Sequence, residues 1–251
     1  MWSDYVRRMA EAYTRLWPSS VPLTVYAEDF DVDVEDVGQE RLPRWFNVWK
    51  KQLANDKDAH GRDRKRMRPK SLPKGYEYRR DCVKFAHKVA AIVHAGAKQR
   101  EDLLIWIDAD TVTHERVDET WLRSLFGEGD HYMAWLSRRR VYPECGFLMF
   151  DCGHSAHENF MSALRNIYES RAVFDLPETH DSYVIDGLVG MFVREGLFPK
   201  PRCLSGERGR ESMHPFVHSE LASRLDHFKG PRKRMKRTPK NESSRTERHW
   251  R

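Results

Sequence analysis

The sequence predicts an α/β protein, with a single domain built on a mostly parallel central sheet flanked by helices. Short apolar runs suited to buried strands alternate along the chain with longer segments whose apolar residues recur at helical spacing. Strands that alternate with helices in this way usually form a parallel sheet. The length of 251 residues is enough for one large α/β domain or two small ones, and the hydrophobic fraction of 39% is enough for a core.

The first third of the chain contains a helix, a strand and a second helix. Apolar side chains at helical spacing predict an amphipathic helix over residues 4–17, which Pro18 ends. The apolar run 21–27 suits a first buried strand, and residues 43–54 predict the second helix. Residues 56–75 are polar, basic and rich in Pro and Gly, so we expect a basic surface loop there.

The rest of the chain continues the alternation. Residues 81–97 have one apolar face and predict a helix. The wholly apolar run 103–107 is typical of a strand covered on both faces. Further strands and helices are expected, in chain order, at 132–136, 145–150, 155–169 and 181–194. The folded domain is therefore placed at 1–233, followed by a basic and polar tail at 234–251.

Composition excludes several classes of protein. No stretch approaches the roughly 18 consecutive apolar residues of a membrane span. The N-terminus lacks the basic and apolar regions of a secretory signal. Four cysteines, without CxxC pairing or zinc spacing, favour reduced thiols and a cytoplasmic location. The net charge of +6 describes solubility and association more than fold.

Two carboxylates follow the apolar strand 103–107. Asp108 and Asp110 stand one residue apart at the carboxyl end of this strand, where ligands bind in open α/β folds. Two carboxylates so placed can share a hard divalent cation, which in turn can neutralise a diphosphate. The alternative is that they cap a following helix, as acidic residues after a strand often do.

Three later motifs bear on this choice. Gly146, at the entry of a strand, would let the backbone approach a bulky ligand, or would mark a bulge. His180 and Asp181 begin a helix, where they could also serve as an N-cap. Near the end of the chain His, Gly and Lys follow at three-residue steps, in His227, Gly230 and Lys233.

The chain resembles the GT-A glycosyltransferases in these motifs, which occur in the family's order. They are Asp108-Ala109-Asp110, Glu144-Cys145-Gly146-Phe-Leu-Met-Phe, His180-Asp181 and His227-x-x-Gly230-x-x-Lys233. The last resembles most closely the branch that holds glycogenin and bacterial lipopolysaccharide galactosyltransferases. The resemblance covers about residues 21–233. It implies the Rossmann-like GT-A fold and transfer of a hexose, with retention favoured, from a nucleotide-sugar donor, with a UDP-sugar favoured.

The resemblance also implies roles for individual residues. Asp108, Asp110 and His227 would hold Mn²⁺ or Mg²⁺, and Asp181 would be the catalytic carboxylate beside the reacting centre. Asp181 could act as a general base, giving inversion, or as a charge-stabilising group, giving retention. Donor contacts are expected from Tyr26, Arg80, Asp81, Lys88, Ala109, Gly146, Gly230 and Lys233. Acceptor contacts are expected from Glu144 and His180, and the charge of the basic loop adds Arg64, Lys65 and Arg66.

Some of these residues could have purely structural roles, and some positions differ from the family pattern. Tyr26 could be a core aromatic residue, and Arg80, Asp81 and Lys88 could form surface salt bridges. Glu144 and Cys145 stand where the family carries Asn-Ala or Asn-Ser. His180-Asp181-Ser182 replaces its usual Asp-Gln pair.

The basic segments suggest that the acceptor is nucleic acid. Residues 62–70 and 229–240 could neutralise phosphates, and phage enzymes that glycosylate hydroxymethylated bases in DNA fit this expectation, which would place the protein in a host cytoplasm. A glycan or lipid-linked acceptor is the alternative. A non-catalytic DNA-binding protein and a nucleotidyltransferase are alternatives of other classes, and neither accounts for His227, Gly230 and Lys233.

Overall fold

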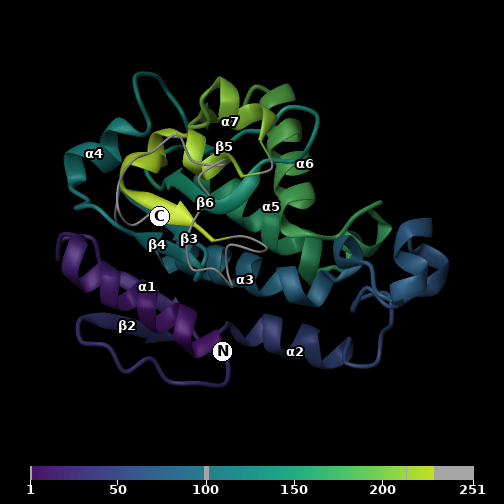
Figure 1. Ribbon diagram of the computed structural model, residues 1–251. Helices are drawn as coiled ribbons and strands as arrows, with labels where there is room; N and C mark the ends of the chain where they lie inside the picture. The colour runs from purple at the N-terminus through teal and green to yellow at the C-terminus, as the bar shows by residue number, and fades with distance from the viewer. Residues whose placement is uncertain (1, 99–101, 213, 229–251) are drawn as a thin grey trace. The chain divides into compact units, whose positions relative to one another are not determined.

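The computed structural model describes residues 2–98, 102–212 and 214–228, and these form a mixed α/β protein (Figure 1). The described residues divide into two compact units. The first unit comprises the segments 1–41, 105–150 and 201–251, and the second comprises 42–104 and 151–200. The α/β class is thus confirmed, while the single domain at 1–233 stays a prediction.

The first unit contains most of the strands. Its helices are α1 (Trp2–Leu16), α4 (Glu119–Ser124) and the short α7 (Glu207–Glu211). Strands β1 (Leu23–Tyr26) and β2 (Val37–Glu40) form a parallel pair. Strands β4 (Thr111–Thr113) and β8 (Leu225–His227) form an antiparallel pair. The 3₁₀ turns η5 (Pro215–His218) and η6 (Glu220–Ser223) precede β8.

The largest sheet has four strands, in the order β3-β6-β5-β7. They are β3 (Leu103–Ile107), β6 (Glu144–Asp151), β5 (Met133–Leu136) and β7 (Arg202–Cys203). Strand β5 runs antiparallel to β6 and parallel to β7, so the predicted mostly parallel sheet is not confirmed. The connection 137–143 between β5 and β6 is too short for the crossover of a dozen or more residues that a parallel pair needs.

The burial of these strands also differs from the prediction. Every residue of β3 is half-buried, although its apolar run predicted a strand covered on both faces. The fully buried strands are β5 and, up to Phe150, β6. Their side chains, together with Tyr132, form the core of this sheet.

The second unit is a layer of helices. It contains α2 (Arg44–Gln52), α3 (Cys82–Lys98), α5 (His157–Glu169) and α6 (Asp181–Arg194), with the 3₁₀ turn η4 (Ala172–Asp175). Helix α3 packs on α5 and α6, and α2 packs on α3 and α5. The predicted helices 43–54, 81–97, 155–169 and 181–194 are therefore confirmed within a few residues at their ends.

The predicted loop 56–75 is more ordered than expected. It carries the 3₁₀ turns η1 (Arg64–Arg66) and η2 (Pro69–Lys74), and a third, η3 (Tyr78–Arg80), follows. Ala59, Met67 and Ser71 are buried in it. Most of its cationic side chains are at the surface, including Arg64, Lys65 and Arg66.

Two expectations from composition concern the described residues as a whole. No described helix combines the length and apolar character that crossing a membrane requires. The four cysteines are all free thiols, and Cys82 and Cys145 are buried. The predicted tail 234–251 lies outside the described residues.

Candidate metal centre

The two aspartates lie in a tight turn between β3 and β4. The backbone N–H of Asp108 donates to the carbonyl oxygen of Gly146 at 2.9 Å, which ties the turn to β6. The N–H of Thr111 donates to the carbonyl of Asp108 at 2.8 Å and closes the turn. Trp106 Nε1 donates to Asp108 Oδ1 at 2.8 Å, which orients that carboxylate. No helix begins here, since the next one, α4, is capped by Asp118, so the capping alternative is wrong.

Strand pairing brings the third residue to the aspartates. Thr111 of β4 lies opposite His227 of β8, and the N–H of Phe228 donates to the carbonyl of Asp110 at 3.1 Å. This pairing sets His227 Nε2 at 2.8 Å from Asp110 Oδ1 and 3.8 Å from Asp108 Oδ2. Figure 1 shows β8 as the yellow arrow beside β4. The three residues that the sequence predicted as metal ligands are thus brought together.

The imidazole of His227 is held on its far side by β6. A Cβ on Gly146 would lie 2.7 Å from both Nδ1 and Cε1 of His227, so only glycine leaves room for the ring. Glu144 Oε1 lies 3.8 Å from Nδ1 and accepts the N–H of Gly146 at 3.2 Å. The Phe216 ring packs edge-on at 5.3 Å between centroids. His227 is 2% exposed, and its Nε2 is the nitrogen that faces the aspartates.

Gly146 and Glu144 have neighbours other than those that the sequence predicted for them. Gly146 was expected to admit a ligand, but the group that approaches its backbone is the side chain of His227. Glu144 was expected at the acceptor, but it is 4% exposed and lies between His227 and Arg138, whose Nη1 is 3.8 Å from Glu144 Oε2. Carboxylates commonly support metal-binding histidines by accepting a hydrogen bond from the outer nitrogen. Glu144 lies beside that nitrogen, at 3.8 Å and beyond hydrogen-bond distance.

These donor atoms suit a divalent cation. One ligand atom from each of Asp108, Asp110 and His227 lies within 4.8 Å of the other two. Both aspartates are only half-buried, so a ligand can reach them. Carboxylate oxygens suit Mg²⁺ and Mn²⁺, and an imidazole suits transition metals, so this set could hold a metal ion.

Besides Gly146, two described residues predicted to contact the donor lie in the same unit as the centre. Ala109 packs, with Ile107, against a cluster of buried residues from α1 and β1. Tyr26 ends β1 and is half-buried, and burial together with the nearby Glu40 raises the pKa of its phenol to about 12. Their contacts to a donor stay predictions.

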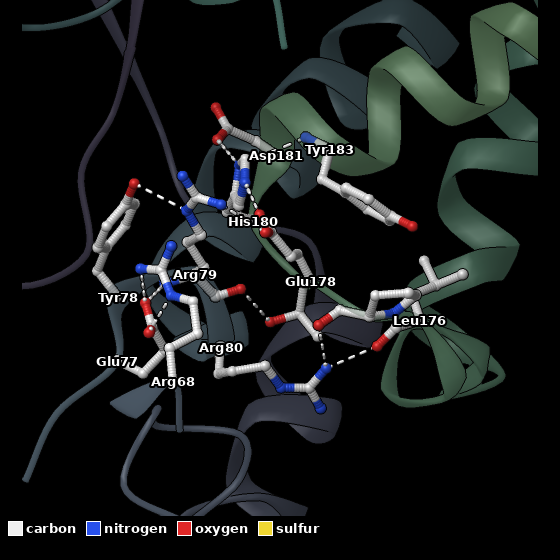
Figure 2. Close-up of polar contacts among 12 residues, drawn as sticks. Arg68, Glu77, Tyr78, Arg79, Arg80, Leu176, Glu178, His180, Asp181 and Tyr183 are labelled. Carbon is white, nitrogen blue, oxygen red and sulfur yellow. Dashed lines mark hydrogen bonds and ion pairs between the residues drawn. The ribbon is translucent and has the colours of Figure 1, made fainter. Parts of the chain in front are cut away.

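The second unit holds the predicted catalytic carboxylate. Asp181 is 4% exposed, and its Oδ2 lies 2.8 Å from Lys88 Nζ of α3. His180 precedes it as the N-cap of α6, because its Nδ1 accepts the N–H of Tyr183 at 3.4 Å. Its Nε2 lies 2.9 Å from Glu178 Oε2 (Figure 2). Both ring nitrogens are therefore engaged, which favours the capping alternative for His180.

The remaining predicted donor residues of this unit are engaged within it. Arg80 is 3% exposed and donates to both carboxylate oxygens of Asp58, at 2.7 and 3.2 Å. These contacts favour a structural role for Arg80, beyond the surface salt bridge considered from the sequence. Asp81 accepts the hydroxyl of Tyr76 at 2.8 Å and the N–H of Lys84 at 3.3 Å.

The structure describes the cations predicted to contact the acceptor, but it does not describe the end of the last motif. Arg64, Lys65 and Arg66 are all exposed, and Arg66 also pairs with Asp58 at 2.9 Å. Gly230 and Lys233 lie outside the described residues, so their contacts to a diphosphate stay predictions. Phe216 and Glu178 belong to no sequence motif, and only the tertiary structure places them beside His227 and His180.

A scan of protein-family models finds no match to this chain, and a search of curated proteins finds none either. What the protein does must therefore be inferred from the residues of the centre and their geometry.

Proposed function

We propose that this protein is a metal-dependent glycosyltransferase of the GT-A type. It would move a sugar from a nucleotide-sugar donor, with a UDP-sugar favoured, to an acceptor hydroxyl. The observation that carries the proposal is the meeting of His227 with Asp110, which stand 117 positions apart in the chain. A strand-end carboxylate pair joined by a distant histidine is the ligand set that the four sequence motifs imply.

Asp108, Asp110 and His227 would hold the cation, and a nitrogen ligand favours Mn²⁺ over Mg²⁺, which prefers oxygen ligands. The bound cation would supply positive charge to the departing nucleoside diphosphate. Neighbouring residues of the chain orient side chains of this ligand set. Trp106 orients one carboxylate of the set, and the ring of His227 packs closely on Gly146 with Glu144 near its Nδ1. Such preorganised groups need little reorganisation during the reaction.

Asp181 remains the proposed carboxylate beside the reacting sugar. It is buried, it is held by Lys88, and it stands at the first position of α6. A helix N-terminus favours a negative charge, which suits a group that stabilises an oxocarbenium-like state. We therefore prefer the charge-stabilising role and a retaining course.

The decisive experiment measures nucleotide release from a panel of nucleotide-sugars, with Mn²⁺ or with EDTA. We expect release of UDP from one UDP-sugar with Mn²⁺ and none with EDTA. The variants Asp110→Asn and His227→Asn should abolish it. Asp33→Asn removes an exposed carboxylate of the same unit and should leave release unchanged. Release that survives EDTA and Asp110→Asn, or no release from any donor in the panel, would overturn the proposal.

The same assay distinguishes the acceptors and the rival enzyme class. The exposed Arg64 and Lys65 favour nucleic acid as the acceptor, so we expect an oligonucleotide with hydroxymethylated bases to increase release. A glycan or lipid-linked acceptor would increase release in its place if that alternative is right. Pyrophosphate as the product, in place of a nucleoside diphosphate, would indicate a nucleotidyltransferase.

A further inference from the structure

Residues 62–80 form a basic segment that is folded without any α-helix or β-strand. It contains the 3₁₀ turns η1, η2 and η3 and carries nine Lys and Arg residues against two acidic ones, Asp63 and Glu77. A solvated loop of this composition would gain little from a fixed shape, because its like charges repel. The contacts that fix its conformation therefore indicate what the segment could bind.

The centre of the basic segment is a buried carboxylate. Glu77 is 2% exposed and accepts two hydrogen bonds from Arg68, at 2.6 and 2.7 Å, and one from Ser71 at 2.7 Å. Burial by itself would raise the pKa of Glu77, but the bonds from Arg68 and Ser71 outweigh it and hold the pKa at about 2. A bidentate pair of this kind fixes the geometry of both partners.

The end of the basic segment is fixed as firmly. Arg80 binds Asp58 with two nitrogens and donates Nη1 to the carbonyl oxygens of Leu176 and Pro177, at 2.6 and 3.1 Å. Gly61 has a φ of +63°, and a Cβ there would collide with the carbonyl oxygen of Glu77. The backbone that carries the cations is thus built into the second unit.

The cations of the basic segment that form no ion pair with a described residue are exposed to solvent. Asp58, Glu77 and Glu178 bind the other four arginines of the basic segment: Arg66, Arg68, Arg79 and Arg80. Asp63 accepts the backbone N–H of Lys65 and caps η1. The five that remain are exposed and form no ion pair with any described residue: Arg62, Arg64, Lys65, Lys70 and Lys74.

An exposed aromatic ring is fixed among these charges. Tyr78 is 46% exposed, and its hydroxyl accepts a hydrogen bond from Arg79 Nε at 3.1 Å (Figure 2). The guanidinium carbons of Arg68 and Arg79 lie 5.9 and 5.8 Å from the ring centroid. Arg79 is itself held by Glu178 at 2.6 Å. The ring is therefore oriented before any ligand arrives, which lowers the entropy cost of stacking on it.

We propose that the basic segment binds single-stranded nucleic acid, with the five exposed cations on the phosphates and Tyr78 stacked on a base. Cations combined with aromatic rings are the usual means of binding single strands. Bases in a duplex are stacked on each other and are not open to Tyr78. Insertion into a membrane surface would need several exposed apolar side chains, and Tyr78 is the one large exposed hydrophobic residue of this segment. The inference goes beyond glycosyl transfer, since such binding needs neither metal nor sugar donor.

The test is fluorescence anisotropy of a labelled 20-nucleotide single strand with the full chain, in EDTA and over a range of salt concentrations. We expect the single strand to bind more tightly than the same sequence as a duplex. Lys65→Glu/Lys70→Glu should weaken binding at least about tenfold at low salt and make the log–log salt slope shallower by about 1.4, or about 0.7 per lost phosphate contact. Tyr78→Ala should weaken binding about tenfold, and Tyr78→Phe should restore most of it.

A charge-matched control separates this surface from the overall basic charge. Arg8→Glu/Lys51→Glu changes the net charge by the same amount at exposed positions of α1 and α2. It should bind nearly as the unaltered chain does, with thermal melts showing that every variant is folded. Equal losses in the two double variants, equal binding by Tyr78→Ala, or preference for the duplex or for phosphatidylserine vesicles would each overturn the proposal. Nucleotide release with Mn²⁺ is measured separately, so failure here leaves the transferase proposal standing.

Discussion

The imidazole of His227 fits against β6 because residue 146 has no side chain. Gly146 has no positive φ, so its importance is space and not backbone conformation. The ring, once seated, has Glu144 on its Nδ1 side and the two aspartates on its Nε2 side. The affinity of the centre for metal should therefore depend on a residue that is not a ligand.

Gly146→Ala tests this dependence. A Cβ 2.7 Å from the ring must displace His227, so we expect Mn²⁺ affinity, measured by calorimetry, to fall about 10- to 100-fold, the usual cost of disturbing the support of a ligand. Gly187→Ala is the matched control, since a Cβ there meets nothing within 4 Å. Unchanged Mn²⁺ affinity in Gly146→Ala would contradict the assignment of His227 as a ligand.

Glu77 leads to a prediction about acid stability. Its pKa of about 2 lies below the ordinary value of 4.5, so it stabilises the folded state at any pH above about 4.5. That contribution is lost as the pH falls from about 4.5 to about 2. Glu77→Gln should lower the free energy of unfolding by about 3 kcal/mol at pH 7, because Arg68 loses its buried partner.

Urea unfolding at pH 7, 4 and 3 measures the difference between Glu77→Gln and the unaltered chain. We expect the difference to shrink steadily with falling pH. The exposed Glu35→Gln should show almost no difference at any of these values. A difference for Glu77→Gln that is constant with pH would mean that the carboxylate is not ionised in the fold.

Among the elements, α6 begins with an unusual cap. His180 accepts the N–H of Tyr183 and faces Glu178, with the rings of Phe85 and Tyr183 nearby. Burial lowers the pKa of His180, although the carboxylates of Asp181 and Glu178 oppose the shift. The helix that carries Asp181 is therefore capped by a histidine that the fold keeps neutral.

This cap predicts a loss of stability in mild acid. A histidine whose folded pKa is lowered stabilises the fold above its unfolded pKa of about 6.5, and this contribution is lost as the pH falls further. His180→Asn keeps a good capping side chain without a titrating group. Chemical unfolding between pH 5 and 8 should show a shallower pH dependence for His180→Asn, while His180→Ala should cost about 1 kcal/mol at pH 8. Identical pH dependence in His180→Asn and the unaltered chain would contradict this.

Across the whole molecule, the two candidate sites fall in different units. The metal centre belongs to the first unit, and the basic segment, Lys88 and Asp181 belong to the second. The direct effect of a metal on stability should therefore appear in the first unit. A ligand at 100 times its dissociation constant stabilises the state that binds it by about 2.7 kcal/mol.

Hydrogen exchange can measure this local effect. With Mn²⁺ we expect slower exchange of the amides in β4, β8 and the turn between β3 and β4, where all three ligands lie. The amides of α3 and α5 should change little. Asp110→Asn should remove the protection. Protection by Mn²⁺ that appears in α3 and α5 and not in β4 or β8 would place the metal site elsewhere.

Local patterns in the sequence determined the longer helices, several strands and the identity of the candidate metal ligands. Apolar periodicity located α1 and α3, and an uninterrupted apolar run located β3, since each signal depends on neighbours within a few positions of the chain. The spacing of Asp108 and Asp110 after a strand, with the motif around His227, indicated the ligand set that β4 and β8 bring together.

The tertiary structure decided what depends on contacts between distant segments. The antiparallel direction of β5 against β6, the place of Glu144 behind His227 and the burial of Arg80 against Asp58 are examples. Periodicity says which face of an element is buried, but not which segment covers it. A charged residue in a motif therefore looks the same in the sequence whether it binds a ligand or, like Arg80, holds the fold together by pairing with a partner far along the chain.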